Sequence, residues 1–125
     1  MTRRNIERAM TELRKASDIL DIALDYIANS AKITILVPGH IRETILFSGL
    51  VDLQYAPGFS DSPPWIIGEV RFEKLSNEDE LMGGEGLWCH GKRSYEKAFP
   101  CYRVSLQSGD FRLKILCIKF EVLNR

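Results

Sequence analysis

The segment from Gly86 to Val104 concentrates side chains that could bind zinc, namely Cys89, His90 and Cys101, with His40 as a distant fourth ligand. Structural zinc sites draw their ligands in pairs about two to four residues apart, because a tight turn then directs both side chains at one ion. Cys89 and His90 are adjacent instead, and Cys101 lies far along the chain. The spacing therefore argues against a metal site.

Cysteine catalysis is the second chemistry that this segment could support. A nucleophilic cysteine needs an imidazole within hydrogen-bond reach, because the thiolate reacts and the thiol does not. In an extended chain Cys89 and His90 point to opposite sides, so His90 is badly placed to activate its neighbour. The chain has 3 cysteines at uneven spacing, which favours reduced thiols over a disulfide framework. We expect buried, unreactive thiols, and we predict no catalytic residue, no metal ligand and no cofactor.

Aromatic and cationic side chains make the same segment a better candidate for binding than for reaction. Aromatic rings beside Arg and Lys supply contact area at little loss of conformational entropy, and aromatic residues and Arg are enriched where proteins bind their partners. Alternating aromatic and charged residues also describe an amphipathic strand, and a tryptophan such as Trp65 often closes a core at the rim of a sheet. The predicted binding residues are Trp65, Trp88, His90, Arg93, Tyr95 and Tyr102.

The composition is that of an ordinary globular protein. The 125 residues are 45% hydrophobic and 27% charged, and 17 basic side chains balance 17 acidic ones. This length predicts a single domain over residues 1–125. A neutral chain has no overall field that would draw it to nucleic acid, which disfavours a nucleic-acid partner. A single-stranded nucleic-acid binder that uses the basic aromatic segment is kept as a third, weaker hypothesis. No apolar run is long enough to span a bilayer and the first residues are charged, which predicts a cytoplasmic protein without a membrane segment.

A long N-terminal helix is predicted from Thr2 to about Asn29. On this helix Asp18, Asp21 and Asp25 would form one ridge, which we interpret as a solvated face. The second half is apolar around most of its circumference, so it must be enclosed by a curling sheet or by a second chain. The prediction rests on the absence of glycine and proline and on apolar residues in steps of three and four: Ile6, Met10, Leu13, Leu20, Leu24 and Ile27.

Strands are predicted after the helix. Gly49 should bend the second of them, and residues 108–110 should form the hairpin turn between the last two. In the last strand the apolar positions change parity near Ile115 and Leu116, which predicts either a β-bulge or burial of both faces. The fold class is therefore α+β, with one long N-terminal helix packed against a curved antiparallel sheet of about five strands. These strands cover residues 32–37, 42–55, 65–74, 101–107 and 111–123.

No motif in this sequence determines a biochemical activity. Our leading hypothesis is a small cytoplasmic binding or interaction protein, not an enzyme, that self-associates as a homo-oligomer and binds a protein or small-molecule partner. The alternative is a small enzyme or ligand-converting domain with a pocket between the helix and the sheet. That pocket would be lined by Trp65, Trp88, His90, Arg93 and Tyr95.

Overall fold

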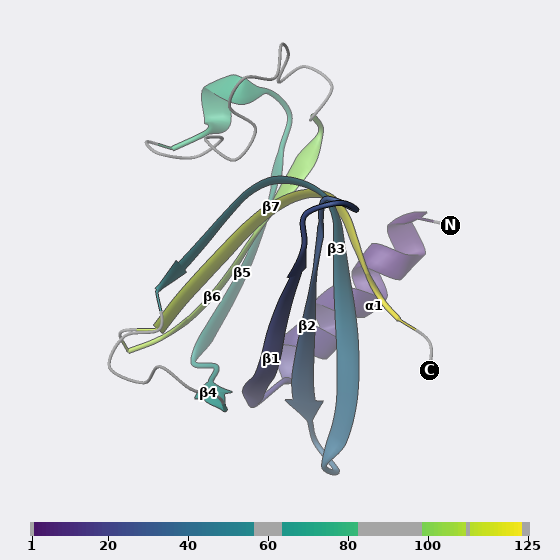
Figure 1. Cartoon of the computed structure of the whole chain (residues 1–125), viewed down its shortest axis with the longest axis vertical. Coiled ribbons are helices and arrows are strands. Elements are labelled where there is room, and N and C mark those ends of the chain that lie inside the picture. Colours follow the sequence, from purple (N-terminus) through teal and green to yellow (C-terminus); the bar gives the residue numbers. More distant parts are fainter. Residues whose placement is uncertain (1, 57–63, 83–98, 110, 124–125) are drawn as a thin grey trace.

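Strands β1 to β7 form one curved antiparallel sheet in the computed structural model, which describes residues 2–56, 64–82, 99–109 and 111–123 (Figure 1). In the sheet the strands follow the order β4-β1-β2-β3-β7-β6-β5, and β3 and β7 arch over together. Within these residues, no helix combines the length and the apolarity that crossing a membrane requires. The elements are α1 (Thr2–Lys15), β1 (Asp18–Asp25), β2 (Ser30–Val37), β3 (Ile41–Ala56), β4 (Trp65–Ile66), β5 (Glu69–Leu75), the 3₁₀ helix η1 (Glu78–Glu80), β6 (Cys101–Ser108) and β7 (Phe111–Val122).

The curved antiparallel sheet is confirmed, but the long helix is wrong in its second half. Helix α1 ends at Lys15. The amide of Ser17 donates to the carbonyl of Leu36 on β2 at 2.9 Å, where a continuing helix would have bonded its own preceding turn. The next residues, Asp18–Asp25, form β1 and pair with β2. The sheet is thus larger than predicted and the helix shorter.

A β-bulge at Leu20 explains why β1 resembles a helix in the sequence. The register with β2 shifts between Ile19 and Asp21, so Leu20 is the extra residue. Ile19 and Ile22 then both reach the core at a spacing of three, which imitates the spacing of one helix face. Leu24 and Ile27, whose spacing extended the predicted helix, are 38% and 100% exposed instead. Asp21 and Asp25 lie along an extended strand, so the predicted acidic ridge on a helix is wrong as well.

The segment predicted as one strand over 65–74 is two strands, β4 and β5, joined by Ile67 and Gly68. The Ile67 amide donates to the carbonyl of Ser17 beside β1, and the Gly68 amide donates to the carbonyl of Gln107 on β6, each at 2.9 Å. This short link therefore connects two sides of the curved sheet that are far apart in strand order.

The bend predicted at Gly49 is confirmed. Gly49 has φ +65°, and a Cβ placed there would lie 2.6 Å from Cγ1 of Ile118 on β7. Glycine tolerates this left-handed conformation and also leaves room for the neighbouring strand. The register with β7 shifts between Leu50 and Asp52, so the bulged residue is Val51 on β3.

Burial of both faces accounts for part of the change of parity in β7. Ile115, Leu116 and Cys117 are consecutive and all buried. Ile115 and Cys117 belong to the main core beside α1, whereas Leu116 belongs to a second, smaller cluster. Phe120 is in the main core as well, so the core-facing parity itself changes after Cys117, beside the bend of β3 at Gly49.

Two apolar clusters occupy the opposite faces of the sheet. The main core contains the apolar side of α1 and stacked aromatic rings, with Phe47 and Phe120 centroids 5.6 Å apart and Phe72 6.0 Å from Phe120. We call the face of the sheet that packs on α1 the inner face and the opposite one the outer face. The smaller cluster consists of Val51, Leu75, Cys101 and Leu116, with Leu81 and Phe99 packed against it.

Candidate functional site

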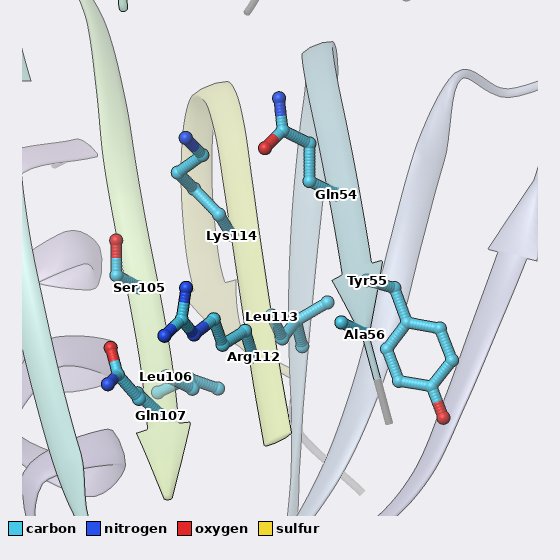
Figure 2. A pocket seen from close by; sticks show the side chains of 9 residues that line it. All are labelled: Gln54, Tyr55, Ala56, Ser105, Leu106, Gln107, Arg112, Leu113 and Lys114. Atoms are coloured by element: carbon cyan, nitrogen blue, oxygen red, sulfur yellow. The ribbon is translucent and has the colours of Figure 1, made fainter. Parts of the chain in front are cut away.

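A hollow of about 340 Å³ lies over the outer face of β3, β7 and β6 (Figure 2). Figure 2 shows the side chains of Arg112 and Lys114 over β7, with Ser105 and Gln107 on β6 to one side and Gln54 on β3 to the other. We call this feature the outer hollow. Its lining residues are Gln54, Tyr55, Ala56, Ser105, Leu106, Gln107, Arg112, Leu113 and Lys114.

Strand alternation places both cations on the outer face. Phe111 and Leu113 are buried in the main core beside α1, so the residues between and after them, Arg112 and Lys114, must point outward. Their side chains are therefore neighbours on one face of the central strand of the hollow.

The register of the sheet brings polar side chains beside these cations. Lys114 stands between Gln54 on β3 and Ser105 on β6, directly across each ladder. Arg112 stands between Ala56 and Gln107 in the same way. Two transverse rows of the sheet thus form the floor of the outer hollow, and each row has a cation at its centre.

Two carboxylates lie beside the outer hollow, and both accept hydrogen bonds. Glu69 lies across from Gln107, and its carboxylate accepts from Nε of Arg71 at 3.1 Å. Asp52 is buried, and its carboxylate accepts from the Leu53 amide at 2.9 Å and from Nε2 of Gln54 at 3.1 Å. None of the described lining residues is acidic. The lining therefore contributes two cations and no carboxylate, while the Asp52 carboxylate adjoins it through Gln54.

The side chains of the outer hollow suit the binding of an anion. Arginine, lysine, serine and glutamine side chains all donate hydrogen bonds, and the first two also carry positive charge. The described lining contains no histidine, cysteine or carboxylate that could serve as a general base beside a nucleophile. Across the described part of the chain, no group of three or more His, Cys, Asp and Glu side chains could hold a metal ion.

The structure places two of the predicted binding residues in the core beside α1. Trp65 is buried and stacks on Phe111 with ring centroids 5.5 Å apart, and Tyr55 meets it edge-on at 5.8 Å. Tyr102 is partly buried and meets Phe120 edge-on at 5.6 Å. Neither Trp65 nor Tyr102 lines the outer hollow. The other predicted binding residues, Trp88, His90, Arg93 and Tyr95, lie outside the described residues.

Cys101 and Cys117 are both buried, as expected for unreactive thiols. Burial raises the pKa of the Cys117 thiol far above its usual range, and the nearby Cys101 raises it further. Cys117 therefore remains a neutral thiol at physiological pH. His40 lies in the turn after β2 and is exposed, while Cys89 lies outside the described residues. Of the four side chains weighed as zinc ligands, His40 and Cys101 are described, and they form no metal cluster with other described residues.

Sequence reasoning missed the residues of the outer hollow because no local signal joins them. The alternation of Phe111, Arg112, Leu113 and Lys114 does indicate that the two cations share a face. Their neighbours come from β3 and β6, which only strand order and register can identify.

Comparison with known proteins adds no family to these observations. Neither the protein-family models nor the curated proteins compared with this chain give a match. Its function must be argued from the chemistry of the described residues.

Proposed function

We propose that this chain is a binding protein whose outer hollow takes a small anionic molecule with carboxylate or phosphate oxygens. One observation carries the proposal: Arg112 and Lys114 share the floor of a hollow in which no described lining residue is acidic. Anionic oxygens are the groups that such donors bind best, because charge-assisted hydrogen bonds are about twice as strong as neutral ones.

The two cations would serve different purposes. The guanidinium of Arg112 is planar and can donate two parallel hydrogen bonds to one carboxylate or phosphate. Lys114 would supply a second, less directional charge, and Ser105 and Gln107 would add neutral donors from the neighbouring strand. A ligand with two anionic groups, or one anionic group and a polar arm, matches this spread of donors.

The size and shape of the outer hollow favour a small ligand held weakly. Its volume of about 340 Å³ lies at the lower end of the range of small-molecule sites. The floor is the face of a sheet, so the ligand would stay partly in contact with water. We expect affinities between roughly micromolar and millimolar, as is usual for contacts that are incompletely desolvated.

The enzyme hypothesis with a pocket between helix and sheet receives less support. The described side chains that α1 buries against the sheet are apolar and packed, with Ala9, Leu13, Ile33 and Ile35 among them. An active site there would need convergent polar groups and space for a substrate. The outer hollow already offers both polar groups and space, so binding there remains the proposed function. A cytoplasmic location and self-association are further expectations.

The proposal can be tested by NMR titration of the full chain with citrate and, separately, with inorganic phosphate at constant ionic strength. Backbone amides of residues 54–56, 105–107 and 112–114 should shift in a saturable manner. The double variant R112Q/K114Q should lose these shifts. Lys119→Gln is the matched control, because Lys119 is an exposed lysine of β7 outside the hollow.

The comparison of the two ligands identifies the preferred oxygen chemistry. Saturation by citrate alone would indicate a carboxylate ligand, and saturation by phosphate alone a phosphorylated one. The proposal would be overturned if neither ligand shifted these amides. It would also be overturned if the shifts survived in R112Q/K114Q while Lys119→Gln removed them.

A further inference from the structure

The two edges of the sheet differ in how they would meet a second copy of the same chain. At one edge, β4 pairs only with Asp18 and Ile19 of β1, so the rest of β1 has no partner among the described strands on that side. Its charged residues are all aspartates. An antiparallel pair of β1 strands centred on Ala23 would set Asp21 against Asp25 of the other copy, and like charges directly opposite are destabilising. This edge disfavours self-pairing.

The opposite edge, β5, carries charges of both signs in a self-complementary order. Glu69, Arg71 and Glu73 alternate with Val70, Phe72 and Lys74. Arg71 and Glu73 stand one residue before and one residue after Phe72, on the same face of the strand. In an antiparallel pair centred on Phe72, Arg71 of each copy would lie directly opposite Glu73 of the other.

We propose that two copies of this chain associate edge to edge through antiparallel β5 strands about a two-fold axis at Phe72. The sheets of the two copies would then continue into each other, and the backbone groups of β5 that no described strand pairs would bond across the axis. Such an interface is isologous, because the same residues contribute from both copies.

Existing ion pairs would extend across this interface. Nη1 of Arg103 lies 3.1 Å from Glu73, and Nε of Arg71 lies 3.1 Å from Glu69. Pairing would join these ion pairs into one series of alternating charge. The series would run from buried Arg103 to Glu73 of one copy, and then to Arg71 and Glu69 of the other copy. The Arg71 and Glu73 side chains are 69% and 47% exposed, so both are accessible for this contact.

The inner face of the same strand supports the pairing. Phe72 is only partly buried in the main core, and the guanidinium of Arg14 lies 4.9 Å from the centre of its ring. The two Phe72 side chains would be neighbours at the axis, where cross-strand aromatic pairs are favourable. Val70 would face Lys74 of the other copy, whose aliphatic stem can cover apolar surface.

Sedimentation velocity from micromolar to millimolar protein tests the interface, with wild type expected to form a concentration-dependent dimer. Arg71→Glu sets like charges opposite twice and should weaken association roughly tenfold or more. Arg71→Lys keeps the positive charge, so this variant should still form the dimer. Lys119→Glu is the matched control, because it reverses the charge of an exposed lysine on β7, which β6 separates from β5.

A wild-type chain that stays monomeric throughout this range would overturn the proposal. So would equal weakening by Arg71→Glu and Lys119→Glu, because that result would indicate a general charge effect or a different partner surface. The interface uses no residue of the outer hollow. R112Q/K114Q should therefore lose the anion without losing the dimer, and failure of either proposal leaves the other intact.

Discussion

The guanidinium of Arg103 on β6 lies 3.1 Å from the carboxylate of Glu73, directly across the ladder on β5. Arg103 is buried, whereas Glu73 is half exposed. Nη2 of Arg103 also donates to the carbonyl of Glu80 in η1 at 3.0 Å. A buried guanidinium needs such partners, because an uncompensated charge in the interior is strongly unfavourable. Arg103 therefore fastens the segment after β5 to the outer face of the sheet.

Replacing Glu73 by Ala should lower the free energy of unfolding by about 1.5–3 kcal/mol, the usual contribution of a hydrogen bond to a charged group. Urea denaturation at dilute protein measures the change. Glu69→Ala is the control, because Glu69 pairs with exposed Arg71 and should lose less than about 1 kcal/mol. If both substitutions had the same effect, the pair with Arg103 would have no special role in stability.

Replacing Gly49 by alanine should destabilise the fold more than the same substitution at Gly109, although the two glycines have similar φ angles. Gly49 has φ +65° and Gly109 has φ +54°. A Cβ at Gly109 would meet nothing within 4 Å, whereas a Cβ at Gly49 would lie 2.6 Å from Cγ1 of Ile118. Gly109→Ala carries only the strain of the left-handed conformation, about 1 kcal/mol, and Gly49→Ala should cost more than that because β7 must also move.

Thermal or urea unfolding of both glycine variants tests this difference. A third variant that combines Gly49→Ala with Ile118→Gly should recover part of the loss measured against Ile118→Gly alone, because it removes both Cγ1 and Cβ of Ile118, which the new methyl group would meet at 2.6 and 2.9 Å. Equal destabilisation by Gly49→Ala and Gly109→Ala would show that contact with Ile118 does not limit position 49.

Strands could be predicted where apolar and polar side chains alternate without interruption. The end of the helix could not be predicted, because a β-bulge in β1 interrupts that alternation. The last two strands and their turn follow from the pattern around Gly109, and Gly49 marks the bend. The extra residue Leu20 changes a period of two into a spacing of three, so β1 reads as more helix. The outer hollow depends on pairing between strands that are distant in sequence, which no local pattern encodes.

Trp65 should report a buried environment, as its stacking on Phe111 implies. The chain has 2 tryptophans, so a Trp88→Phe variant isolates the emission of Trp65. We expect emission at short wavelength and weak quenching by iodide, because the residue is 8% exposed. Phe111→Ala should shift the emission to longer wavelength and increase quenching. Water-like emission from Trp65 in the Trp88→Phe background would contradict its place in the core.

Cys117 should make the fold sensitive to alkaline pH. Burial raises the pKa of its thiol in the folded chain above the ordinary value of 9.0, so the folded chain keeps the proton while the unfolded chain loses it. The unfolded state then binds fewer protons, and the free energy of unfolding falls as pH rises above about 9, whereas below that pH the contribution is fully present. Comparing wild type with Cys117→Ala by urea denaturation from pH 7 to 10 separates this thiol from other groups that titrate there. The stability difference between the two proteins should move in favour of the variant as pH rises, and a difference independent of pH would show that Cys117 does not ionise on unfolding.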